Sequence, residues 1–142
     1  MKVSDLMSTN VITVPPEISV ADAARTMERS DTGLLPVCSS DGHIQGILTD
    51  RDIVIRCVAT RMDPKQTKVQ DLMTRGVISV SPDEDIKEAA NMMSGEQIRR
   101  IPVVEQERIV GILSLADLVH SDIYDMEAAQ ALTEITDSIH EF

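Results

Sequence analysis

The sequence contains two copies of one pattern, and this repeat constrains the fold more than any other feature. Residues 2–7, KVSDLM, return as residues 68–73, KVQDLM, at an offset of 66 (68 − 2). Residues 46–49, GILT, return as residues 111–114, GILS, at an offset of 65 (111 − 46). A register kept over most of the 142 residues indicates two similar structural repeats, and clefts between such repeats commonly bind ligands.

Each repeat is close to the lower size limit for independent folding. The pattern predicts a first domain over residues 1–60, a linker over 61–67, a second domain over 68–120 and a C-terminal helix over 121–142. A domain of about 60 residues is marginally stable alone, because it buries a small share of its surface. We therefore expect the two repeats to depend on each other.

The composition indicates a soluble globular protein. Hydrophobic residues make up 42% and charged residues 26% of the chain, which are ordinary values. The net charge of −11 disfavours nonspecific binding of DNA or RNA, because their phosphates are neutralised by Lys and Arg. No apolar run approaches the roughly 18 residues that span a membrane, and the chain starts in the repeat without a signal peptide. We therefore expect a cytoplasmic protein without membrane or nucleic-acid partners.

The two cysteines, Cys38 and Cys57, do not occupy equivalent positions in the repeats. Without a framework of paired cysteines, they are expected to be reduced and buried as small apolar side chains.

Each repeat is predicted to fold as β-α-β-β-α, which makes the chain an α/β protein. Short β-branched strands are expected over residues 11–14 and 77–80, each closed by proline. A helix follows Ser19 or Asp85, because an acidic residue stands three positions after each of these capping residues. The remaining expected elements are strands at residues 34–37 and 101–104, strands at 43–48 and 109–113, and helices that begin at Thr49 and Ser114.

A last helix is predicted outside the repeats. Its apolar residues recur at spacings of three or four, which is the pattern of an amphipathic helix. Such an apolar face covers either the core of its own chain or a partner. The residues are Met126, Ala129, Leu132, Ile135, Ile139 and Phe142.

The most informative polar residues stand where each repeat passes from a strand into a helix. A hydroxyl residue is followed three positions later by an aspartate, as Thr49 with Asp52 and as Ser114 with Asp117. One interpretation is a helix N-cap with a carboxylate favoured by the positive helix end. The other is recognition, because a hydroxyl and free N–H groups suit phosphate, while a carboxylate can accept both hydroxyls of a ribose. The residues alone leave both interpretations open.

The order of these motifs, doubled along the chain, resembles a tandem pair of cystathionine-β-synthase (CBS) domains, also called a Bateman module. The resemblance covers residues 2 to 120, and it rests on the β-α-β-β-α repeat, the Leu/Ile-Pro-Val strands and the two Gly-x-x-Thr/Ser-x-x-Asp segments. It implies an α/β fold of two repeats related by pseudo-twofold symmetry. It also implies a regulatory module whose clefts hold AMP, ADP, ATP, S-adenosylmethionine or dinucleotides. The chain is similar to the stand-alone bacterial and archaeal CBS pairs.

The resemblance also assigns binding roles to residues. The Thr-Asp and Ser-Asp pairs described above match the hydroxyl and the ribose-binding carboxylate of the family's two clefts. In the family, main-chain groups of the opening strands bind the edge of adenine. The corresponding residues here are Ile12 and Ile78. The apolar walls on either side of the base correspond to Pro36 and Val37 in the first repeat and to Ile101, Pro102 and Val103 in the second.

The two repeats differ just before these Pro-Val strands. Arg99 and Arg100 stand in the second repeat, where family members often carry basic residues that hold phosphates, whereas Gly33 and Leu34 stand in the first. Because a guanidinium can bind phosphate through two hydrogen bonds, the second repeat is expected to hold phosphate that the first does not. The alternative is a pair of solvated arginines. Arg51 could contribute as well, or it could pair with the aspartate on either side of it.

No pattern of catalytic or metal-binding residues stands out. His43, His120 and His140 lack the spacing of three or four residues expected of ligands on one helix. Asp50 and Asp52, two positions apart at a helix start, do not face each other. Neither a glycine-rich phosphate loop nor a serine elbow is present. We expect a homodimeric sensor of adenine nucleotides, without catalysis, cofactor or metal, that signals to an effector protein which the sequence does not identify. The alternative is a dimerisation scaffold that needs no ligand.

Overall fold

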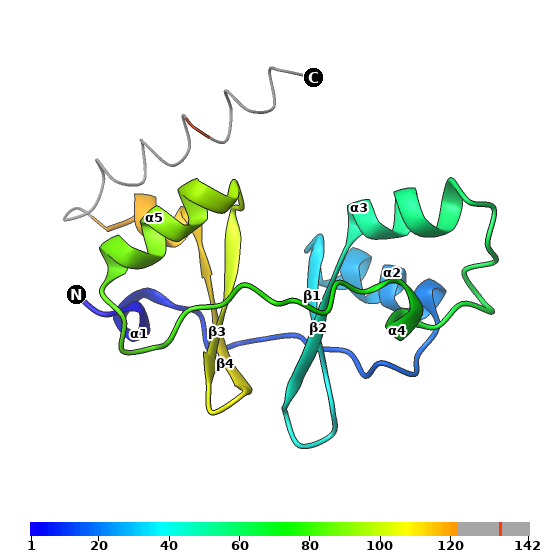
Figure 1. Cartoon of the computed structure of the whole chain (residues 1–142), viewed down its shortest axis with the longest axis horizontal. Helices are drawn as coiled ribbons and strands as arrows, with labels where there is room; N and C mark the ends of the chain where they lie inside the picture. The colour runs from blue at the N-terminus through cyan, green and yellow to red at the C-terminus, as the bar shows by residue number, and fades with distance from the viewer. Residues whose placement is uncertain (122–133, 135–142) are drawn as a thin grey trace. The chain divides into compact units, whose positions relative to one another are not determined.

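The computed structural model describes residues 1–121 and residue 134 (Figure 1). The chain divides into two compact units. Unit 1 consists of Met1–Val11, Ile78–Gln106 and Val110–Phe142, and unit 2 consists of Ile12–Val77 and Glu107–Ile109. Each unit contains one two-stranded sheet with helices beside it, so the predicted α/β class is confirmed.

Unit 2 is built around an antiparallel hairpin. Its strands pair from Leu34 opposite Thr49 to Cys38 opposite Ile44, with an irregularity between Val37 and Cys38. The helix that directly follows this hairpin starts as an α-helix and ends as a π-helix. The elements are α2 (Val20–Ser30), β1 (Leu34–Cys38), β2 (Ile44–Thr49), α3 (Asp50–Ile53), η1 (Val54–Val58) and α4 (Val69–Leu72).

Unit 1 repeats this plan around a second two-stranded sheet. Residues 108 and 109, at the start of the last strand, are grouped with unit 2. The elements are α1 (Val3–Leu6), α5 (Ile86–Glu96), β3 (Arg100–Glu105), β4 (Arg108–Ser114) and α6 (Leu115–Val119).

The long helix of each unit begins at the capping residue that the sequence predicts. The Ser19 hydroxyl accepts a hydrogen bond from the N–H of Asp22 at 3.1 Å at the start of α2. At the start of α5, the Asp85 carboxylate accepts one from the N–H of Lys87 at 2.8 Å. These bonds satisfy N–H groups that have no partner inside the helix.

The opening strands predicted over residues 11–14 and 77–80 are shorter than expected. Each keeps a single bridged residue, Val14 or Val80, which pairs in parallel with the middle of β1 or β3. The proline that follows each segment limits the pairing, because it has no N–H with which to extend a ladder.

The opening helix of each repeat packs on the other repeat, which the sequence analysis did not predict. In unit 1, the N–H of Val3 in α1 donates to the carbonyl of Glu84 at 2.9 Å. In unit 2, the N–H of Val69 in α4 donates to the carbonyl of Ile18 at 2.9 Å. The compact units therefore cross the sequence boundaries of the repeats, and both Val3 and Val69 are fully buried in the core of their unit.

The chain that follows each exchanged helix passes close to a strand at a glycine. After α1, Ser8 bridges Ile112 beside Gly111, and after α4, Thr74 bridges Ile47 beside Gly46. A Cβ atom at Gly46 would lie 2.9 Å from the carbonyl oxygen of Thr74, and one at Gly111 would lie 3.0 Å from that of Ser8. The matched glycines of the repeat are thus places of close backbone approach.

The predicted environment of the cysteines is confirmed. Cys38 and Cys57 are buried and form no disulfide, and burial raises the pKa of the Cys38 thiol to about 11. The predicted C-terminal helix lies outside the described residues except for Glu134. In the part of the chain that the structure describes, every helix is too short or too polar to cross a membrane.

Candidate functional site

In unit 1, Ser114 and Asp117 bond to each other at the start of α6. The Ser114 hydroxyl accepts from the N–H of Asp117 at 3.1 Å, and Oδ2 of Asp117 accepts from the N–H of Ser114 at 2.8 Å. This reciprocal capping box confirms the helix-cap interpretation. It occupies one carboxylate oxygen only, and Oδ1 has no hydrogen-bond or ion-pair partner within residues 1–121 and 134. Asp117 can therefore accept further hydrogen bonds from a ligand.

In unit 2, Thr49 and Asp52 form the same capping box at the start of α3, but the aspartate is also shared. Oδ2 of Asp52 accepts from the N–H of Thr49 at 2.9 Å, while Oδ1 lies 3.8 Å from Nε of Arg56. Arg56 is held in place because its Nη1 donates to the carbonyl of Leu72 in α4 at 2.7 Å. The position that matches Arg56 in the second repeat is Ser121, so Asp117 lacks this cation.

Arg99 and Arg100 lie next to the capping box of unit 1. The N–H of Leu115, the first residue of α6, donates to the carbonyl of Arg99 at 2.8 Å. This bond places Arg99 beside the residue that follows Ser114. Both arginines are exposed, and within the described residues their guanidinium groups make no hydrogen bond or ion pair. The positive charge is therefore available either to water or to an anionic ligand.

The corresponding place in unit 2 carries the opposite charge. The N–H of Asp50 donates to the carbonyl of Gly33 at 2.9 Å, which repeats the Leu115–Arg99 bond. The Asp50 carboxylate lies so close to Gly33 that a Cβ atom there would stand 2.6 Å from Oδ2. Arg51 contacts Asp50 through its backbone N–H at 2.8 Å. Unit 2 therefore has a carboxylate where unit 1 has a leucine, and a glycine where unit 1 has an arginine.

Several of the residues predicted to surround adenine are buried in the cores of their units. The side chains of Val37, Ile101 and Val103 are fully buried in those cores. Successive strand residues point to opposite faces, so Pro36 and Pro102 point away from these core side chains. Both prolines are buried as well. The predicted adenine-edge residues are Ile12 and Ile78, and each is 40% exposed.

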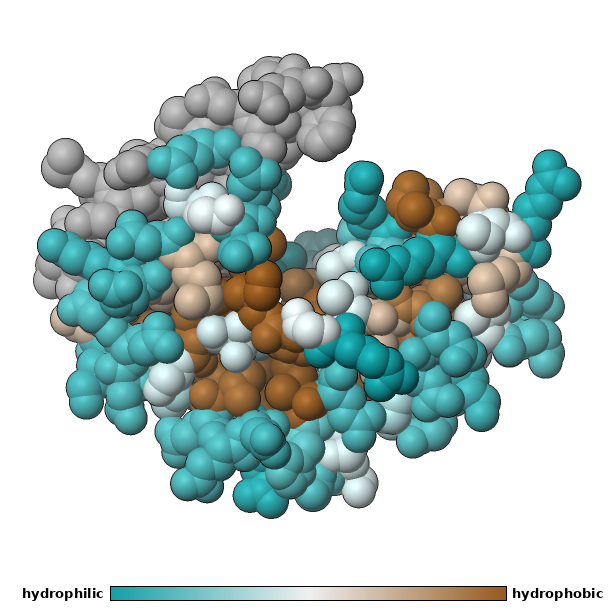
Figure 2. All heavy atoms as spheres, viewed as in Figure 1, coloured by the Kyte–Doolittle hydropathy of each residue, from teal (hydrophilic) through white to brown (hydrophobic). Residues whose placement is uncertain are grey.

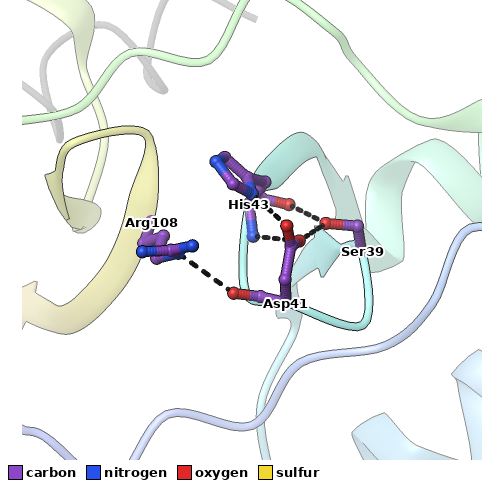
Figure 3. A network of polar contacts seen from close by, with 4 residues as sticks. All are labelled: Ser39, Asp41, His43 and Arg108. Carbon is purple, nitrogen blue, oxygen red and sulfur yellow. Dashed lines mark hydrogen bonds and ion pairs between the residues drawn. The ribbon is translucent and has the colours of Figure 1, made fainter.

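A polar network at the β1–β2 turn was not predicted from the sequence (Figure 3). Asp41 accepts a hydrogen bond from the Ser39 hydroxyl, and its Oδ2 lies 2.7 Å from Nδ1 of His43. Hydrogen bonds from Ser39 and His43 hold the pKa of Asp41 well below its usual range. Nε of Arg108 donates to the Asp41 carbonyl at 3.2 Å. These contacts order the turn against residues 107–109, which is a structural role.

A hollow of about 530 Å³ lies in unit 2. It is lined by residues within 13–17 and by residues 38–40, at and just after the end of β1. None of the predicted site residues lines it. In residues 1–121 and 134, no group of three or more His, Cys, Asp or Glu side chains is arranged to hold a metal ion.

Comparison with known proteins identifies the family. The family model of the CBS domain matches this chain twice, at residues 3–58 and 69–123. The chain belongs to the CBS domain family. A curated relative of similar length is the CBS domain-containing protein YhcV of Bacillus subtilis, which is 38% identical over 134 residues, 94% of either chain. The resemblance found in the sequence is thereby confirmed.

Solved structures of CBS proteins are similar to this chain over most of its length. The crystal structure of Hypoxic Response Protein I with two coordinated zinc ions has a TM-score of 0.77 and 35% identity, covering 84% of this chain and 97% of that one. The CBS domain pair of protein MJ0100, in complex with methylthioadenosine and S-adenosylmethionine, has a TM-score of 0.73 and 31% identity. The match covers 82% of this chain and 91% of that one.

Proposed function

We propose that this CBS pair is a regulatory module that binds an adenine nucleotide and does not itself catalyse a reaction. The observation that carries the proposal is the arrangement at the start of α6, where Oδ1 of Asp117 has no partner within the described residues and the N–H of Leu115 bonds to the carbonyl of Arg99, which Arg100 follows. A carboxylate suits the hydroxyls of a ribose, and two exposed guanidinium groups suit a phosphate. A nucleotide carries both groups.

The class of ligand is supported by the solved relative that is in complex with two adenosine compounds. Neither of those compounds carries a phosphate, whereas the arginines here offer phosphate a binding partner. For this chain we therefore favour AMP, ADP or ATP over S-adenosylmethionine or methylthioadenosine.

We further propose that a phosphorylated ligand prefers the residues of unit 1. The Asp50 carboxylate of unit 2 would repel phosphate, and Asp52 is already shared with Arg56. The proposed contacts are Ser114 and Asp117 to the ribose, Arg99 and Arg100 to phosphate, and Ile78 with the backbone of Ile101, Pro102 and Val103 to the base. The second set, which we expect to bind phosphate less well, is Ile12, the backbone of Pro36 and Val37, Thr49 and Asp52. That the base also reaches the other repeat stays a prediction, as do the homodimer, the cytoplasmic location and the effector protein.

A thermal-shift screen over adenosine, AMP, ADP, ATP and S-adenosylmethionine tests the proposal. A ligand at about 100 times its dissociation constant adds roughly 2.7 kcal/mol to the free energy of unfolding, which raises the melting temperature of a chain of this size by several degrees. We expect AMP, ADP or ATP to give the largest shift. No shift with any of these compounds at millimolar concentration would favour the scaffold that needs no ligand.

We predict that Arg100→Ala and Arg99→Ala weaken AMP binding but leave adenosine binding unchanged. The lost hydrogen bonds go to the phosphate, and a bond to a charged group contributes about 1.5–3 kcal/mol, roughly a 10- to 150-fold change in affinity. Isothermal titration calorimetry measures both ligands. Arg29→Ala, which removes an equal charge from the exposed end of α2, is the matched control. Equal weakening of AMP and adenosine binding would mean that the substitutions affect folding. Unchanged AMP binding would mean that both arginines are solvated and do not contact the phosphate.

A further inference from the structure

Arg56 of η1 joins two parts of unit 2 that are distant in the sequence. Its Nη1 donates to the carbonyl of Leu72 at 2.7 Å, and its Nε lies 3.8 Å from Oδ1 of Asp52. Leu72 is the last residue of α4, and the last carbonyls of a helix have no partner inside that helix. One guanidinium group therefore bonds to a helix end and lies beside a carboxylate of the proposed ligand site.

The other exposed side chains of η1 are apolar. Val54, Ile55 and Val58 are 54%, 50% and 61% exposed, and apolar atoms are visible on the surface over α3 and the segment after it (Figure 2). Apolar side chains accept no hydrogen bond from a guanidinium group. Within residues 1–121 and 134, the contacts with Asp52 and Leu72 are therefore the two that hold the guanidinium group of Arg56.

The two contacts of Arg56 differ in kind. The contact with Leu72 is a short hydrogen bond, whereas the 3.8 Å contact with Asp52 is an ion pair that is too long for a hydrogen bond. The Asp52 side chain is 15% exposed, so a ligand reaches little of this carboxylate while Arg56 lies beside it. A ribose hydroxyl that donates to Oδ1 forms the hydrogen bond that Arg56 does not form, and it therefore competes with Arg56 for this oxygen.

Unit 1 contains the matching parts without the arginine. Ser121 stands at the position of Arg56. Within the described residues, no side chain donates to the carbonyl of Leu6, the last residue of α1, which matches Leu72. The link between a ligand-site carboxylate and an opening helix is thus present in unit 2 and absent from the described part of unit 1, so the chain contains its own control.

We propose that Arg56 transmits ligand occupancy at Asp52 to α4. When a ribose binds Oδ1, the ion pair that orients Arg56 is lost, its bond to Leu72 weakens, and α4 is held less firmly. Because α4 is the opening helix of the second repeat, a ligand bound by residues of the first repeat then changes how a segment of the second repeat packs. The inference rests on the nucleotide binding proposed above, and it assigns a mode of regulation to the residues of unit 2.

Coupling of this kind is reciprocal, so removal of Arg56 should strengthen ligand binding. Arg56→Met keeps the apolar stem of the side chain, and we expect it to raise the affinity for adenosine about two- to fivefold, the usual contribution of a partly exposed ion pair. Adenosine is the probe because it carries no phosphate. Isothermal titration calorimetry in the Asp117→Asn chain, in which the unit 1 residues bind less well, measures the affinity of unit 2. Arg29→Ala in the same chain removes an equal charge and should leave the affinity unchanged.

Hydrogen exchange followed by mass spectrometry tests the effect on α4. Arg56→Met and Asp52→Asn, without ligand, should each speed exchange in residues 68–74 about two- to fivefold. Saturating adenosine should do the same in the wild-type chain and should add nothing in Arg56→Met. Residues 2–8, which contain α1, are the matched control and should exchange at the wild-type rate in both variants. Circular dichroism verifies that each variant is folded.

The outcomes keep this inference apart from the proposed function. Lower or unchanged adenosine affinity in Arg56→Met would overturn the role of Arg56, as would equal exchange of residues 68–74 in the wild type and both variants. Either result leaves nucleotide binding in place, because binding itself is measured in the same titrations. A chain that binds no adenosine compound contradicts the sensor and, with it, the competition at Asp52.

Discussion

Asp117→Asn is expected to weaken AMP binding by about 1.5–3 kcal/mol, roughly 10- to 150-fold in affinity, the range for hydrogen bonds to a charged group. In the free protein Oδ2 of Asp117 accepts from Ser114, and Oδ1 has no partner within the described residues. An asparagine can keep the bond to Ser114, but it loses the charge and one acceptor oxygen. Isothermal titration calorimetry with AMP gives the change in affinity.

Two variants serve as controls for this result. Asp52→Asn is expected to change AMP affinity less, because the Asp52 carboxylate is already shared with Arg56. Glu88→Gln removes a first-turn carboxylate from α5 that is not among the proposed contacts, and it should leave AMP affinity unchanged. If Asp117→Asn lowers the free energy of unfolding by under about 1 kcal/mol and leaves AMP affinity unchanged, its carboxylate acts only at the helix end.

Gly46→Ala is expected to lower the free energy of unfolding by about 1–3 kcal/mol, the usual cost of adding atoms to a packed site. The added Cβ would lie 2.9 Å from the Thr74 carbonyl oxygen and 2.7 Å from Sδ of Met73. The methionine can move aside, but the Thr74 backbone is held by its pairing with Ile47. Urea denaturation measures the change.

Gly95→Ala is the control of opposite sign. Among the described residues, no atom outside its chain neighbours and its own helix backbone lies within 4 Å of a Cβ at Gly95, which is in α5. Replacing a helical glycine by alanine stabilises by roughly 0.5–1 kcal/mol where space allows. A Gly46→Ala variant as stable as Gly95→Ala would mean that the chain after α4 does not pass close to β2 as described.

The repeat by itself determined the family and most of the local structure. The starts of α2, α3, α5 and α6 could be predicted because a cap is made between residues two or three positions apart, such as Ser114 and Asp117. The hairpins could be predicted because their strands are joined by short polar turns. The pairing of Ser39, Asp41 and His43 also lies within one turn, yet it was not predicted, since a Ser-x-Asp-x-His spacing matches no common structural motif.

Only the tertiary structure decided which repeat each opening helix joins. Val3 and Val69 occupy identical positions in the two copies of the pattern. The sequence is therefore the same whether each opening helix packs on its own repeat or on the other one. The tertiary structure also decided how far the two aspartate carboxylates are already engaged by other side chains. Asp52 and Asp117 follow the same motif, but Arg56 reaches Asp52 because α4 supplies a carbonyl that holds its guanidinium. Local hydrogen bonds follow from residue spacing, whereas contacts between residues far apart in the chain depend on how the segments pack.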